Sequence, residues 1–74
     1  MYFSQRLKQL RIKSNYMQKE IAALIGVSVR TFQDYEHGNT EPNIEKLIKL
    51  ADIFNVSLDY LVGRDFHATN AEED

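Results

Sequence analysis

Four side chains between Ser28 and Gly38 have the chemistry needed to recognise base pairs. An apolar side chain can contact a thymine methyl group, Arg can fork onto guanine O6 and N7, Gln can pair with adenine, and a carboxylate can accept from cytosine N4. A helix starting at Ser28 would turn Phe32 and Tyr35 inward and leave the four facing outward. They are Val29, Arg30, Gln33 and Asp34. If such a helix lies in a major groove, these four side chains are the candidates for contacts with bases, and Arg30 is the principal candidate.

Asp34 has a second interpretation. It follows Arg30 by four residues, which is the spacing of an ion pair on one helix face. A carboxylate close to phosphates would cost free energy through charge repulsion. We therefore favour a role in which Asp34 orients the guanidinium of Arg30, over a direct contact with cytosine.

Five segments have the apolar spacing and the end signals of short helices, and no segment has a strand pattern. Ser4, Ser28, Asn43 and Ser57 are the expected N-caps. The apolar stripe of the fourth helix is expected to be Ile44, Leu47, Ile48, Ala51 and Phe54. The sequence predicts an all-α fold with helices over 5–14, 18–25, 28–36, 44–54 and 58–62.

Gly26 joins the second and third predicted helices. Glycine adopts a positive φ without a Cβ penalty, so Gly26 can end one helix while Ser28 caps the next. Two helices that cross steeply after so short a turn need a small residue at the crossing, and Ala22 fits that need. The segment is therefore predicted to be a helix-turn-helix unit.

The composition bears on other classes of function. The 74 residues suit one domain, and without cysteine there is no disulfide framework or Cys-based zinc site. His37 and His67 lie far apart and no catalytic motif accompanies them, so we expect no enzymatic activity, no cofactor and no metal. No apolar run approaches the roughly 18 residues of a membrane span, and no signal peptide pattern is present. The expected location is the cytoplasm.

The charge of the chain is unevenly distributed. Residues 1–30 carry six basic residues and one acidic residue, a net charge of +5, whereas residues 31–74 carry three basic and ten acidic residues, a net charge of −7. A basic face can attract phosphates although the whole chain has a charge of −2. The acidic second half would also suit a basic protein partner.

The chain resembles the Cro and phage-repressor type of helix-turn-helix regulators, the XRE family, from about Leu7 to Gly63. Four blocks carry the resemblance: LKQLR, QKEIAALIGVS, YEHG and IEKLIKLADIFNVSLDYLVG. It implies a compact five-helix, lambda-repressor-like DNA-binding domain over 1–63. The residues that follow, 64–74, are acidic and have little to pack, so they are expected to form a flexible tail. The resemblance also implies a bacterial or phage transcriptional regulator, associated with the nucleoid when bound, that represses by occupying a palindromic operator with its third helix in the major groove.

The resemblance also implies roles for individual residues. Arg11 and Glu36 match a partly buried ion pair that presents the guanidinium to a phosphate, and a purely architectural pair is the alternative. Gln18 matches a residue whose amide meets a phosphate beside a helix N-terminus, although it could be a plain surface residue. The full set of expected phosphate contacts is Arg11, Gln18, Lys19, Ser28, Asn39 and Thr40.

The chain departs from the family pattern at two places. Met17 stands where a Ser or Thr cap is usual, so the second helix could begin less firmly, or Met17 could pack on the core. The loop after Gly38 has Asn39, Thr40 and Glu41 in place of Lys or Arg. We therefore expect modest affinity that falls steeply with salt.

One short helix reads only a few base pairs, so we expect a homodimer on inverted half-sites. Leu58 and Leu61 should complete the core of each monomer, and the interface is expected at Tyr60, Val62 and Phe66. The alternative function is an antitoxin-like or regulatory protein-interaction module with weak or no DNA binding. Control could come from a protein antagonist, or the chain could be part of a longer parent protein.

Overall fold

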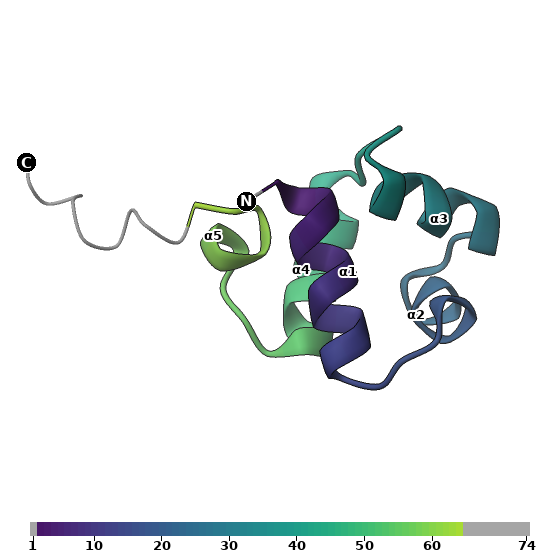
Figure 1. The fold of residues 1–74 in the computed structure, drawn as a ribbon, viewed down its shortest axis with the longest axis horizontal. Coiled ribbons are helices and arrows are strands. Elements are labelled where there is room, and N and C mark those ends of the chain that lie inside the picture. Colours follow the sequence, from purple (N-terminus) through teal and green to yellow (C-terminus); the bar gives the residue numbers. More distant parts are fainter. Residues whose placement is uncertain (1, 65–74) are drawn as a thin grey trace, which may run out of the picture.

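The computed structural model describes residues 2–64, and within them the chain forms five α-helices and no strand (Figure 1). The helices are α1 (Phe3–Lys13), α2 (Gln18–Ile25), α3 (Val29–His37), α4 (Ile44–Phe54) and α5 (Leu58–Leu61). The expected all-α, five-helix fold is confirmed. The observed bounds of α2 and α4 are those expected, and those of α3 and α5 differ by one residue.

The expected start of the first helix at Gln5 is wrong. The helix begins at Phe3 with Tyr2 as its N-cap, and the backbone N–H of Tyr2 donates to Oε1 of Gln5 at 3.1 Å. This bond is one half of a capping box, in which a side chain of the first turn satisfies the backbone at the cap. It outweighs the intrinsic preference of Ser4 for the cap position, and Ser4 lies inside the helix.

The turn between α2 and α3 is built as the sequence predicts. Gly26 has φ 79° and ψ 33°, and the N–H of Val27 donates to the carbonyl of Ala22 at 3.0 Å. A Cβ at Gly26 would meet no heavy atom within 4 Å, so the left-handed backbone is what favours glycine there. Ser28 Oγ then accepts from the N–H of Thr31 at 3.0 Å and starts α3 at once.

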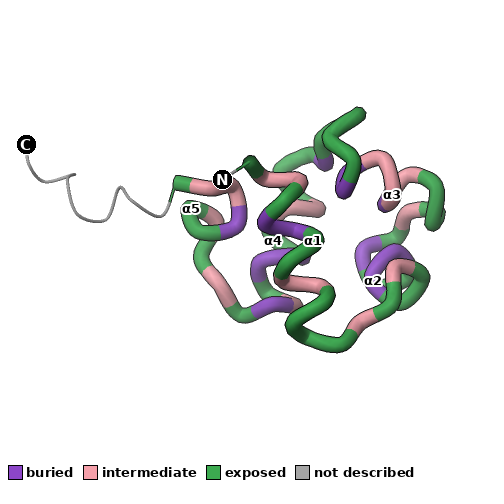
Figure 2. The backbone as a smooth tube through the Cα atoms, in the orientation of Figure 1, coloured by how far each residue is buried: buried purple, intermediate pink, exposed green. Residues whose placement is uncertain are grey.

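The buried apolar side chains form one core to which all five helices contribute. The backbone trace shows a buried stretch in each helix (Figure 2). Ala22 is buried where α2 packs on α3, as its small size suggests. The aromatic rings of Phe32 and Tyr35 meet edge to face with centroids 6.4 Å apart. The core consists of Leu7, Ile21, Ala22, Ile25, Phe32, Tyr35, Leu50, Ala51, Phe54 and Leu61.

The apolar stripe expected on α4 is partly wrong. Ile44 and Ile48 are 63% and 46% exposed, whereas Leu50, which the stripe omitted, is fully buried. The inward face runs through positions 47, 50, 51 and 54, which is also an i, i+3, i+4, i+7 pattern. Because α4 carries apolar residues on more than one face, its periodicity is compatible with either assignment, and packing decides between them.

Met17 does not pack on the core, since about half of it is exposed. The start of α2 is stabilised in another way, because the N–H of Met17 donates to Oε1 of Glu20 at 2.7 Å. Glu20 also places a negative charge in the first turn, where it interacts favourably with the helix dipole. None of the helices within residues 2–64 is long and apolar enough to cross a membrane.

Candidate nucleic-acid interface

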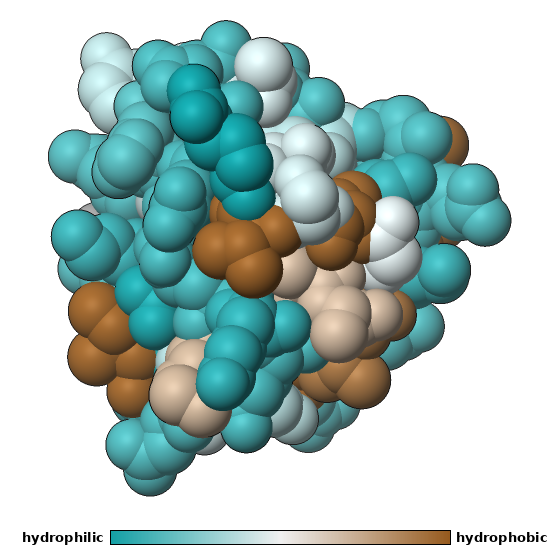
Figure 3. Space-filling view, turned by 90° about the vertical axis from the view of Figure 1, so that its right-hand side faces the viewer, coloured by the Kyte–Doolittle hydropathy of each residue, from teal (hydrophilic) through white to brown (hydrophobic). Residues whose placement is uncertain are grey.

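Helix α3 lies at the edge of the molecule, with one face anchored in the core and the other open. Phe32 and Tyr35 are buried, and Val29 and Arg30 at its N-terminal end are exposed. The space-filling view of the α2 and α3 side shows a surface that is mostly hydrophilic, with apolar atoms gathered from its centre toward the lower right and at the lower left (Figure 3). A helix held in this way can present its outer side chains to a large ligand.

Arg30 and Asp34 lie close together on the outer face of α3. Arg30 Nε is 3.6 Å from Asp34 Oδ1, and the side chain of Arg30 remains 81% exposed. Asn39 Nδ2 donates to the same carboxylate oxygen at 3.4 Å. The carboxylate therefore accepts a hydrogen bond from Asn39 and lies close to the guanidinium of Arg30, an arrangement compatible with an orienting role.

Arg11 of α1 and Glu36 of α3 form a bidentate ion pair. Arg11 Nε donates to Glu36 Oε2 at 2.6 Å and Nη2 donates to Oε1 at 3.2 Å. The side chains are 14% and 1% exposed. A third donor, Nη1, bonds the carbonyl of Tyr16 at 3.1 Å. A guanidinium has five N–H groups, so one on each terminal nitrogen remains available for a phosphate.

Two glutamines extend this ion pair into a network that the sequence did not predict. Gln18 Nε2 at the start of α2 donates to Glu36 Oε1 at 3.0 Å. Gln33 Nε2 on α3 donates to Gln18 Oε1 at 3.3 Å. Four polar side chains on three helices are thus joined, and Gln33 is the member on the side of α3 where Arg30 also lies. Each residue was a candidate separately, but no sequence spacing signals contacts between different helices.

The remaining predicted phosphate contacts lie at the helix ends. Lys19 follows Gln18 in the first turn of α2 and is exposed, and Ser28 is exposed at the N-cap of α3. Asn39 and Thr40 are exposed directly after Gly38, which ends α3 with φ 79°. Two helix N-termini and the loop after α3 are therefore available to phosphate groups through side chains and backbone N–H groups.

Thr31 belongs to this surface although the sequence did not single it out. Its Oγ1 accepts from Ser28 Oγ at 3.0 Å, so the two hydroxyl groups lie together at the start of α3. The signal that could have identified Thr31 is its place three residues after an N-cap serine, the position whose backbone N–H the cap bonds. In the part of the chain that the structure describes, no group of three or more His, Cys, Asp or Glu residues could hold a metal ion.

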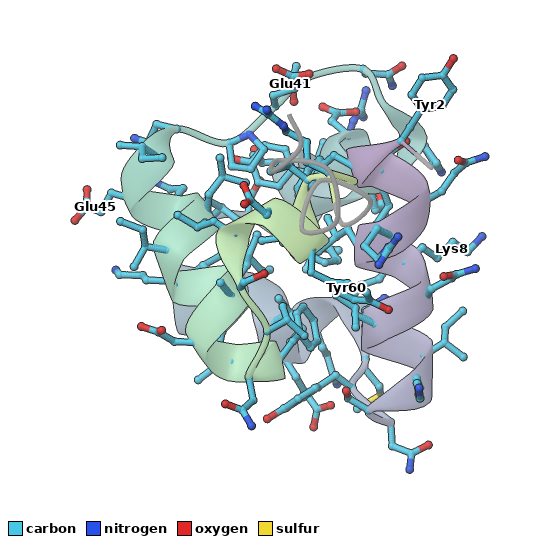
Figure 4. The ribbon with its side chains drawn as sticks, turned by 90° about the vertical axis from the view of Figure 1, so that its left-hand side faces the viewer. Tyr2, Lys8, Glu41, Glu45 and Tyr60 are labelled. Carbon is cyan, nitrogen blue, oxygen red and sulfur yellow. The ribbon has the colours of Figure 1, made fainter. Side chains whose placement is uncertain are left out.

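The expected dimer residues have different environments. Tyr60 lies between α5 and α1 and keeps part of its ring exposed (Figure 4). The guanidinium of Arg6 lies 3.8 Å from the centroid of the Tyr60 ring, a cation–π contact. Val62 is half-buried at the end of α5. Phe66 lies outside the described residues, and so does the tail expected over 64–74 except for its first residue, Arg64. Leu61 is fully buried and Leu58 packs against the core.

Comparison with known sequences identifies similar proteins over most of the chain. A family model described as helix-turn-helix matches residues 7–61. The transcriptional regulator ImmR of Bacillus subtilis strain 168 is 36% identical over 74 residues, which is all of this chain and 58% of that protein. The phage CTXphi repressor RstR of Vibrio cholerae is 38% identical over 64 residues, which is 86% of this chain and 57% of RstR. The chain therefore spans little more than half the length of these relatives.

Two solved structures have the same arrangement of helices. The P22 c2 repressor in complex with the synthetic operator 9T superposes with a TM-score of 0.81 at 31% identity, over 88% of this chain and 98% of that one. A transcriptional regulator from Listeria innocua gives a TM-score of 0.80 at 43% identity, over 82% of this chain and 57% of that one.

Proposed function

The chain belongs to the helix-turn-helix family, and from that premise we propose that it is a sequence-specific, DNA-binding transcriptional regulator. The observation that carries the proposal is α3, whose inner face is fixed by Phe32 and Tyr35 and whose outer face presents Arg30 beside Asp34. A helix of this kind can enter the major groove and bring its N-terminal half to the base edges. The solved P22 c2 complex contains operator DNA bound to a chain of this fold.

Repression is the mode of action that the relatives favour. RstR and P22 c2 are both named repressors. This chain would repress by occupying an operator and excluding polymerase. Such a protein would work in the bacterial cytoplasm, where its operator is found.

In the proposed complex, phosphate contacts would position α3. Arg11 has two N–H groups that are not bonded to Glu36 or Tyr16, and Gln18 has a second amide hydrogen. These donors lie beside Glu36 and would contact phosphates of one DNA strand. Lys19, Ser28, and the loop residues Asn39 and Thr40 would meet phosphates from the ends of α2 and α3. Val29 and Gln33 would join Arg30 at the base edges, and Asp34 would orient Arg30.

A two-fold dimer would give the specificity that one helix lacks. We place its interface at the exposed part of Tyr60, at Val62 and at the chain that follows, which includes Phe66. In a dimer of this kind the two α3 helices enter successive major grooves, about 34 Å apart, so that the site is an inverted repeat.

The proposal is tested by selecting bound duplexes from a random pool and then measuring affinity as a function of salt. We expect an enriched inverted repeat with half-sites one helical turn apart. Affinity should fall linearly on logarithmic axes with a slope of about −0.9 for each phosphate contacted. A chain that enriches no sequence and binds no duplex at low salt would instead be a protein-interaction module.

Replacing Arg30 with alanine should reduce the discrimination between the preferred base pair and the others at one position by about 1–3 kcal/mol. The reason is the loss of a forked contact to guanine O6 and N7. Competition between duplexes that differ at that position measures the change. Lys19→Ala is the matched control. Loss of one phosphate contact should weaken binding to all duplexes alike and reduce the slope of log affinity against log salt by about 1. Full sequence preference in the Arg30 variant would remove Arg30 from the base-reading set.

A further inference from the structure

We propose that the buried carboxylate of Glu36 fixes, through Gln18, the orientation of the Gln33 amide, so that Gln33 reads DNA with its carbonyl oxygen. Gln33 would then select an amino group on one strand, which means adenine or cytosine, over the keto groups of guanine and thymine. This inference rests on the proposed function and specifies how one residue of the interface recognises bases.

Glu36 is the fixed end of the chain of contacts. Its side chain is 1% exposed and both of its oxygens are bonded to Arg11, so it acts as a carboxylate that only accepts hydrogen bonds. Any polar group that contacts Glu36 Oε1 must therefore donate a hydrogen bond to it. Gln18 is 3.0 Å away and must therefore turn its NH₂ group, not its oxygen, toward Glu36.

The orientation of Gln18 determines that of Gln33. With its nitrogen committed to Glu36, Gln18 presents Oε1 on its other side, and this oxygen can only accept. Gln33 lies 3.3 Å from it and must also donate, so its Nε2 is held on the α2 side. The direction of both amides follows from the one charged group at the end of the chain.

The carbonyl oxygen of Gln33 remains for an external partner. Within residues 2–64 no hydrogen bond to Gln33 Oε1 is formed, and the side chain is partly exposed on α3. In the major groove an acceptor is complementary to adenine N6 or cytosine N4 and is repelled by guanine O6 or thymine O4. The second N–H of Gln33 Nε2 can still donate, so the fixed orientation of the amide, and not the loss of a donor, carries the selection. A glutamine freed from Gln18 could turn its NH₂ group toward the groove and would then accept guanine or thymine as well.

The experiment compares base preferences of the wild-type chain and a Gln18→Met variant by selection from a random pool. The position read by Gln33 is the one that loses its preference in Gln33→Ala. At that position the wild type should prefer adenine and cytosine over guanine and thymine by about 5-fold or more, the lower end for a base contact. In Gln18→Met the freed amide can turn over, so this preference should fall by about 5-fold.

Two controls separate this effect from a general loss of structure or binding. Lys19→Ala should lower the affinity for all duplexes and leave the preference at that position unchanged, and circular dichroism reports whether each variant is folded. If Gln18→Met does not fold, Gln18→Ala provides the test, because it also removes the oxygen to which Gln33 donates.

The outcomes distinguish this inference from the function on which it rests. Acceptance of guanine or thymine at that position by the wild type, or an unchanged preference in a folded Gln18 variant, would each overturn the role of the amide chain while leaving DNA binding intact. Failure of the wild type to bind any duplex at low salt would overturn both proposals.

Discussion

Replacing Glu36 with alanine is expected to lower the free energy of unfolding by about 3–5 kcal/mol, because it leaves a partly buried guanidinium without its charge partner. Arg11 is only 14% exposed and directs two nitrogens at Glu36. Gln18 would lose its acceptor as well. A chain of this length has a total stability of about 4–11 kcal/mol, so much of the protein could be unfolded at room temperature. Urea unfolding followed by circular dichroism measures the difference.

Asp34→Ala is the matched control for this prediction. Asp34 also pairs with an arginine and lies on the same helix, but Arg30 is 81% exposed and the two atoms are 3.6 Å apart. Exposed pairs contribute at most about 1 kcal/mol, so the control should remain close to the wild type. Equal effects of the two substitutions would show that burial of the Arg11–Glu36 pair has no special role in stability.

A double variant, Arg11→Met with Glu36→Met, tests the reason for the loss. Removing both charges leaves no unpaired ion in the interior, and replacement of a buried pair by apolar side chains is often neutral or stabilising. We expect the double variant to be more stable than Glu36→Ala and to bind DNA weakly, since Arg11 and the acceptor of Gln18 are both gone. That result would separate the contribution of the pair to folding from its proposed contribution to binding.

The parts of the fold that the sequence predicted well are those fixed by local chemistry. Gly26 at φ 79° and Ser28 as a bonded cap define the turn within three residues. Asn43 and Ser57 cap α4 and α5 with their side chains, and Asn55 ends α4 at φ 56°. Each of these signals acts over one helical turn, so the sequence contains everything needed to recognise it.

The parts that the sequence did not predict depend on contacts between distant residues. The start of α1 is an exception, because it was missed although its signal is local: Ser4 was expected to be the N-cap, whereas the bond from Tyr2 to Gln5 places the start earlier. The contacts from Gln33 to Gln18 and from Gln18 to Glu36 join α2 to α3 across the turn. The spacing of residues along one helix predicts which side chains face outward. Which side chains of two different helices contact each other depends on the angle between those helices.

The face of α4 provides the sharpest test of how packing overrides periodicity. Leu50→Ala is expected to lower the free energy of unfolding by about 2–5 kcal/mol, through lost transfer free energy and the cavity left in the core. Leu50 is fully buried, whereas Ile48 on the same helix is 46% exposed. Ile48→Ala removes a similar volume from a site that remains in contact with water, so it should cost well under half as much. Urea unfolding of both variants measures the difference, and a larger loss for Ile48 would mean that α4 is rotated and that its periodic stripe, not the packing described above, faces the core.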